Sequence, residues 1–97
     1  MMPNYRVLVE VRNLPARLLE GAKSPVGFYA TRFVHASGEA AAGQAAIETL
    51  KEEFLPLFGE RMADEWQAMA HIDELEKVET IPDHAPSAGA VWFVMDD

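Results

Sequence analysis

The sequence predicts a single α+β domain over residues 1–97, in which a helix packs on one face of an antiparallel sheet of about four strands. Three patterns favour this class: strict alternation near the start, an apolar stripe with helical spacing in the middle, and an apolar run near the end. A chain of this length forms one core. The predicted order of elements is β-β-α-(α)-β-β.

The first predicted strand covers residues 5–12, where apolar and polar side chains alternate. One side carries Tyr5, Val7, Val9 and Val11, and the other carries Arg6, Leu8, Glu10 and Arg12. Such alternation is typical of a strand with one face in the core. Pro15 ends the strand because proline has no amide hydrogen for the ladder. We expect residues 16–26 to form a loop with at most one helical turn.

The second predicted strand covers residues 27–36 and is rich in aromatic and β-branched types, which favour strands. One side carries Tyr29, Thr31, Phe33 and His35, and the other carries Phe28, Ala30, Arg32, Val34 and Ala36. Because both sides are partly apolar, this strand is predicted to be central in the sheet.

A helix is predicted to begin after Ser37, since a serine hydroxyl can accept from free amides and Glu39 suits the positive end of the dipole. Its apolar stripe is Ala40, Gly43, Ile47, Leu50, Phe54 and Leu57. Gly43 within this stripe predicts a close approach to a strand. Pro56 is expected to kink or end the helix near Phe54, with a left-handed stop at Gly59.

The remaining elements are less regular. Met62, Trp66 and Met69 have the spacing of a short second helix within residues 60–70. Residues 71–81 repeat apolar types every three positions, which we interpret as a bulged strand, with a continued helix as the alternative. Residues 83–89 are turn formers, and the apolar run 90–95 predicts a strand buried on both faces.

The charge balance excludes two classes of partner. Sixteen acidic and eight basic residues give a net charge of −8, which repels nucleic acid and anionic membrane surfaces. The acidity serves solubility or a basic protein partner. There is no cysteine, no leader with the pattern of a signal peptide and no apolar stretch of about 20 residues, so we expect a cytoplasmic protein without disulfides.

Aromatic residues predict an interface. A single helix covers one face of a sheet, yet the large residues must point to both faces. They are Phe28, Tyr29, Phe33, Trp92 and Phe93. An exposed apolar patch of this kind marks an interaction site, so we predict a homodimer or a protein partner. In the alternative, the loop 16–25 or the helix 62–69 of the same chain folds across the second face.

Three residues of the second strand are candidates for ligand binding in a pocket between sheet and helix: Tyr29, Arg32 and His35. As an imidazole, His35 could act as an acid or base, or it could be a structural residue at the strand end. Arg32 needs a partner on its partly apolar side. We expect a cross-strand ion pair with Glu10, the alternative being an anion site shared with Arg6 and Arg12.

No metal site or cofactor is predicted. His71, Asp73 and Glu74, like the pair Asp83-His84, are metal-capable, but neither group has a recognised ligand spacing. No phosphate loop or nucleophile elbow is present. A non-enzymatic interaction protein is therefore the leading hypothesis, and a small-molecule binder or cofactor-free enzyme is the alternative.

Two stretches carry a resemblance. Residues 27–34 (GFYATRFV) before an alanine-rich helix, and residues 73–78 (DELEKV) before an aromatic strand, resemble a group of small bacterial α+β proteins without an assigned activity. Residues 5–54 are similar, in part, to HicB-type antitoxins, in which a glycine-aromatic strand precedes a helix that begins near a serine or threonine. That second resemblance implies a toxin-neutralising role.

Overall fold

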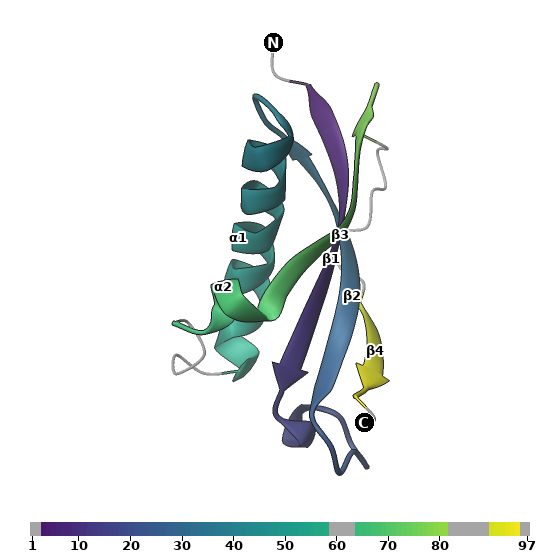
Figure 1. Ribbon diagram of the computed structural model, residues 1–97, viewed down its shortest axis with the longest axis vertical. Helices are drawn as coiled ribbons and strands as arrows, with labels where there is room; N and C mark the ends of the chain where they lie inside the picture. The colour runs from purple at the N-terminus through teal and green to yellow at the C-terminus, as the bar shows by residue number, and fades with distance from the viewer. Residues whose placement is uncertain (1–2, 59–63, 82–89, 96–97) are drawn as a thin grey trace.

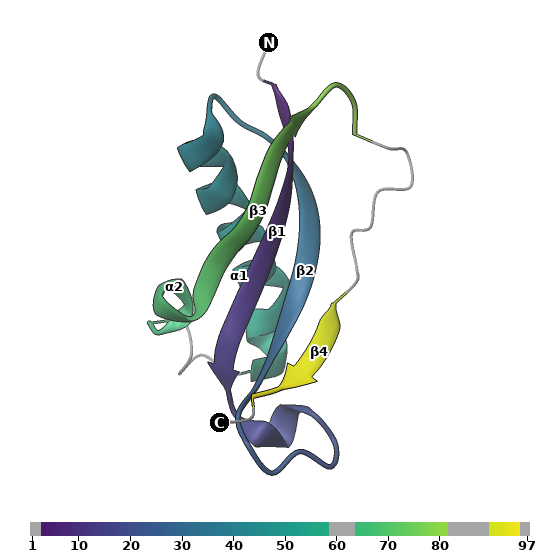
Figure 2. The same ribbon diagram turned by 45° about the vertical axis from the view of Figure 1, so that its right-hand side comes forward.

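Four strands form one antiparallel sheet, and both helices lie on the same side of it (Figure 1). The computed structural model describes residues 3–58, 64–81 and 90–95, without the side chains of residues 57 and 58. The strands are β1 (Asn4–Leu14), β2 (Val26–His35), β3 (Ala70–Val78) and β4 (Val91–Val94), in the order β3-β1-β2-β4 (Figure 2). The helices are α1 (Glu39–Phe58) and α2 (Trp66–Met69), with a short 3-10 turn, η1 (Ala16–Leu18). The predicted class and order are confirmed.

The two long strands at the centre have the predicted alternation. In β1 the odd-numbered residues from Tyr5 to Val11 are buried, and β2 lies between β1 and β4 as expected for a central strand. An extra residue interrupts the pairing between Val11 and Leu14. Asn13 lies there with φ of 64°, a left-handed conformation that asparagine tolerates. The loop that follows contains one helical turn, as predicted.

A bulge in β3 explains why its apolar residues Ile72 and Leu75 are three positions apart. Leu8 of β1 is opposite Glu74, whereas the next residue, Val9, is opposite Ile72, so β3 carries one extra residue there. Because side chains alternate along a strand, the extra residue brings Ile72 and Leu75 to the same face, towards α1. The prediction of a bulged strand is confirmed.

The helix α1 buries a face that differs slightly from the predicted stripe. Ala42, Gly43, Ala46, Ile47 and Leu50 are buried. Ala40 is exposed, so its place in the predicted stripe is wrong, because Ala42 and Ala46 continue the buried face instead. A methyl group on Gly43 would lie 3.3 Å from Cγ1 of Ile72, which confirms the close approach to a strand.

Pro56 does not end α1. The helix continues to Phe58, so the expected end near Phe54 is wrong. Proline has no amide hydrogen, so the helix loses one hydrogen bond, to the carbonyl four residues before Pro56. Less than one turn follows Pro56, so little of the helix is disturbed. Pro56 is exposed, which places its ring away from the core. The predicted stop at Gly59 lies outside the described residues.

The short helix α2 is attached to α1 by a tryptophan. Trp66 is 1% exposed, and its indole Nε1 donates a hydrogen bond to the carbonyl of Ile47 at 3.0 Å. Met69 is also buried, as the predicted spacing requires. Met62 lies outside the described residues. The hydrogen bond places α2 beside α1, on the same side of the sheet (Figure 1).

The core between the sheet and the helices collects most of the buried apolar residues. They are Tyr5, Val7, Val9, Val11, Leu14, Val26, Phe28, Ala30, Val34, Ala36, Ala42, Ala46, Ile47, Leu50, Trp66, Met69 and Ala70. Burial of this apolar surface is the main favourable contribution to folding.

The apolar strand near the end of the chain lies at the edge of the sheet, so the prediction of an inner strand is wrong. Val91 is 70% exposed and Val94 is 40% exposed. A continuous apolar run indicates burial on both faces when a strand is central, but four residues of β4 pair only with β2 in the described part of the chain.

Gly27 allows β4 to join the sheet. Gly27 of β2 is opposite Phe93 of β4, and the Phe93 ring occupies the space that a side chain at Gly27 would need. A methyl group there would lie 2.5 Å from Cζ of Phe93 and would also collide with the backbone carbonyl oxygen of Val11. The backbone of β1 cannot shift as easily as a side chain, so glycine is required at this position.

We expect Gly27→Ala to lower the free energy of unfolding by about 1–3 kcal/mol, the usual cost of overpacking. Urea unfolding followed by circular dichroism measures the change. Gly38→Ala is the matched control, since a methyl group at Gly38 would meet no atom within 4 Å. Equal stability of the two variants would contradict the close contact.

Candidate functional site

The face of the sheet opposite α1, here called the open face, is not covered by the described helices or the described loop. Leu18 and Leu19 pack against the core, and Trp66 and Met69 belong to it. The loop 16–25 lies at the end of the sheet near β4 (Figure 2). In the part of the chain that the structure describes, neither the loop 16–25 nor α2 therefore folds across the open face. The alternative to an interface required one of them to do so.

The five predicted interface aromatics separate onto the two faces. Phe28 and Trp92 lie on the core side, where the Phe28 ring centroid is 4.6 Å from that of Phe54 and 5.1 Å from that of Trp92. Because β2 alternates, Tyr29 and Phe33 point to the open face. Phe93 lies there as well, with its ring centroid 5.3 Å from that of Tyr29. Phe28 is thus a core residue, the partly buried Trp92 packs against the core, and neither points to the open face.

The open face is divided into two halves. The aromatic half lies over β2 and β4 and carries Tyr29, Phe33, Val91 and Phe93, with Thr31 between Tyr29 and Phe33. The polar half lies over β1 and β3 and carries Arg6, Glu10, His71, Glu74 and Glu76, together with the partly exposed Leu8. Val91 was not among the predicted interface residues, although its alternation with Phe93 in the run 90–95 was a usable signal.

An ion pair crosses the polar half. Nε of Arg6 donates to Oε1 of Glu76 at 2.7 Å, and this hydrogen bond is the main reason that the pKa of Arg6 is raised. The side chains are 29% and 56% exposed, so the pair contributes at most about 1 kcal/mol. Charged and solvated, this half is suited to contact with water.

A tyrosine hydrogen bond marks the boundary between the halves. The hydroxyl of Tyr29 donates to Oε2 of Glu10 at 2.7 Å. This bond, then desolvation and then the negative charges of Glu10 and Asp73 raise the pKa of Tyr29. The tyrosine is therefore held neutral, with its ring packed against Phe93.

Arg32 does not pair with Glu10, and this prediction is wrong. Arg32 is opposite Val7 on the core side, whereas Glu10 points to the open face. The partner is Glu53 of α1: Nε of Arg32 donates to Oε2 at 2.8 Å, and Nη2 donates to Oε1 at 3.1 Å. Nη1 also donates to the carbonyl of Thr31 at 2.7 Å.

An anion site shared by Arg32, Arg6 and Arg12 is excluded by the same alternation, because Arg6 and Arg12 lie on the other face of the sheet. The sequence contained the signal that was missed. Arg32 shares a face with Ala30 and Val34, so its partner had to come from the helix above that face.

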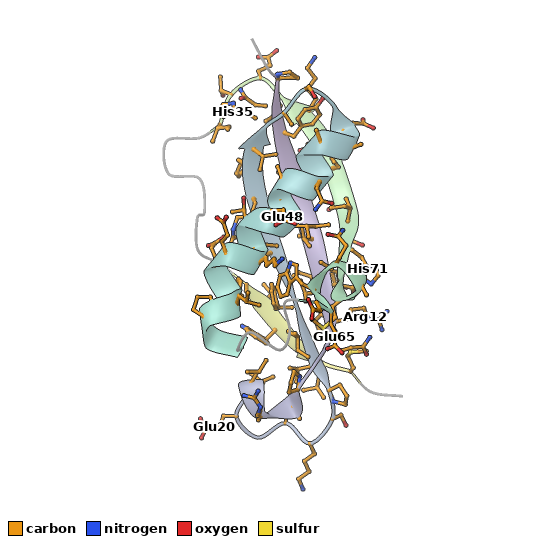
Figure 3. All side chains as sticks on the ribbon, turned by 90° about the vertical axis from the view of Figure 1, so that its left-hand side faces the viewer. Arg12, Glu20, His35, Glu48, Glu65 and His71 are labelled. Atoms are coloured by element: carbon orange, nitrogen blue, oxygen red, sulfur yellow. The ribbon has the colours of Figure 1, made fainter. Side chains whose placement is uncertain are left out.

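The three predicted ligand residues are not brought together. Arg32 is buried on the core side, Tyr29 is bonded to Glu10 on the open face, and His35 is exposed at the end of β2. His35, opposite Asn4 at the start of β1, and His71, opposite Glu10 further along that strand, also lie apart (Figure 3). The geometry offers no shared pocket for Tyr29, Arg32 and His35.

Within 3–58, 64–81 and 90–95, no group of three or more His, Asp or Glu side chains is arranged to hold a metal ion. Asp83 and His84 lie outside these ranges. The described helices lack the combination of length and apolar composition that crossing a membrane requires.

Comparisons with models of protein families, with curated proteins and with solved structures find no match to this chain. The geometry of the open face is therefore the basis for a functional proposal.

We expect Glu53→Ala to lower the free energy of unfolding by about 1–3 kcal/mol, because the buried guanidinium of Arg32 loses two of its acceptors. Glu52→Ala, at an exposed neighbouring position on α1, should change stability by no more than about 0.5 kcal/mol. Chemical unfolding of both variants gives the comparison. Equal losses of unfolding free energy in the two variants would mean that the ion pair between Arg32 and Glu53 does not stabilise the fold.

The raised pKa of Tyr29 predicts a stability change in alkali. The hydrogen bond to Glu10 favours the neutral phenol, so its contribution is complete below the ordinary tyrosine pKa of about 10 and is lost as the pH rises through the higher folded value. Comparison of the ultraviolet titration curves of wild type and Tyr29→Phe separates the signal of Tyr29 from that of Tyr5. Glu10→Gln should move the Tyr29 midpoint down, and an unchanged midpoint would refute the assigned cause.

Proposed function

We propose that this chain is a non-enzymatic interaction protein that acts as a homodimer and holds another protein on its open sheet face. The observation that carries the proposal is the aromatic half of that face: Tyr29, Phe33 and Phe93 are partly exposed, and Val91 is 70% exposed. Several partly exposed aromatic and aliphatic side chains on one face of a sheet are characteristic of protein contacts.

The composition of the face supports a protein partner over a small ligand. Aromatic side chains are enriched in the cores of protein interfaces, where they offer a large contact area at a low cost in side-chain entropy. A polar half with a charged pair borders the aromatic half, which is the usual arrangement of an apolar centre and a polar rim. A ligand pocket, by contrast, would need the separated side chains of Tyr29, Arg32 and His35 to converge.

The ring pair Tyr29 and Phe93 is already ordered in the single chain. The rings pack at 5.3 Å, and the Tyr29 hydroxyl is fixed by Glu10. Binding of a partner therefore loses little side-chain entropy at these two residues, since preorganisation lowers the entropic cost of binding.

The test is a pull-down from native lysate with tagged wild type, Phe33→Gln and Thr80→Gln, combined with light scattering of each purified protein. We expect wild type and Thr80→Gln to be dimeric and to retain the same stoichiometric partner. Phe33→Gln should lose most of that partner, because a polar group then lies in the aromatic half. Thr80 is an exposed residue after β3 and serves as the control.

A monomeric mass for wild type, together with the absence of a stoichiometric partner, would contradict the proposal. Retention of the partner by Phe33→Gln would assign the binding to another surface, such as the acidic one, and would contradict the role of the aromatic half.

A further inference from the structure

The two edges of the sheet differ in a way that bears on self-association. At one edge, β3 carries Asp73, Glu74, Glu76 and Lys77 and is bent by a bulge. Charged side chains and bulges are the features by which sheet proteins prevent their edges from pairing with other strands. The β3 edge is therefore protected against pairing.

The other edge lacks this protection. Residues 91–95, which include β4, carry no charged side chain. Val91 and Val94 are 70% and 40% exposed. Unpaired backbone groups on an exposed apolar edge strand are a template for pairing with a further strand.

The backbone of β4 can form such a ladder. The amide of Met95 donates to the carbonyl of Pro25 at 2.9 Å, so Met95 directs its backbone groups towards the chain segment that leads into β2. Bonded and non-bonded pairs alternate along an antiparallel ladder, so Val94, opposite Val26, directs its backbone N–H and C=O away from β2.

We propose that a second copy of this chain pairs antiparallel with β4, so that the two four-stranded sheets join into one. The inference rests on the homodimer of the proposed function and assigns its interface. Contact through this uncharged strand avoids placing the acidic surfaces of two copies, each with a net charge of −8, against each other. Antiparallel pairing of a strand with itself also has the closed two-fold symmetry of most homodimers.

This arrangement extends the surface that holds the partner. The two-fold axis of an antiparallel pair is perpendicular to the sheet, so the open faces of both copies lie on the same side and both α1 helices on the other. Val91 and Phe93 belong to the edge strand. The two aromatic halves therefore adjoin across the new ladder and form one continuous patch.

The first experiment compares Val91→Lys with His71→Lys by sedimentation. Each substitution adds one positive charge to the open face, the first at the β4 edge and the second at the protected β3 edge. A lysine at position 91 puts a charged side chain into the uncharged contact between the two β4 strands, so Val91→Lys should raise the dimer dissociation constant at least about tenfold. His71→Lys should leave it within a factor of about two, and circular dichroism verifies that both variants fold.

The second experiment uses the absence of cysteine. Val94→Cys introduces a single thiol at the β4 edge, and a short bismaleimide should join two copies efficiently if the β4 strands are neighbours. Glu74→Cys on β3 is the control and should give little covalent dimer. Phe33→Gln should remain dimeric, because its position is on the face and not at the edge.

The outcomes separate the two proposals. A monomeric wild type contradicts the homodimer itself. A dimeric wild type that is unaffected by Val91→Lys and is not cross-linked through Val94→Cys overturns the β4 interface and leaves the interaction function standing.

Discussion

The pairing register of β1 with β2 is the constraint on which the rest of the molecule depends. Side chains alternate between the faces of a sheet, so a shift of one residue would exchange the core and the open face. With Val7 opposite Arg32 and Glu10 opposite Tyr29, the apolar side of β1 meets Phe28 and Ala30 under α1. The same register sends Tyr29 and Phe33 to the open face.

One charged side chain accompanies the apolar residues under α1. Arg32 is 4% exposed, a position at which an unpaired guanidinium would be very costly. The two hydrogen bonds between Arg32 and Glu53 attach α1 to β2. At another position along α1, Gly43 lets the helix approach β3 closely. The helix is thereby fixed over one face, and the described helices leave the other face uncovered.

Most elements could be predicted because their signals are local. Alternation identified β1 and β2, and the spacing of Gly43, Ile47 and Leu50 identified α1. The candidate site was predicted less well. Phe28 and Trp92 were assigned to the interface together with Tyr29, Phe33 and Phe93, and Arg32 was given the wrong partner. Whether an aromatic residue is in the core or on the surface depends on strand pairing, which composition does not encode.

Periodicity and side-chain chemistry along the chain were enough to predict the fold class, the single core, the bulge in β3 and the surplus of aromatic residues over what one helix can cover. Strand order and packing were needed to show that β4 is an edge strand, that Glu53 neutralises Arg32 and that the open face has an aromatic and a polar half. Each of these depends on contacts between segments far apart in sequence, and their energies become definite only when the register of the strands and the position of α1 are fixed.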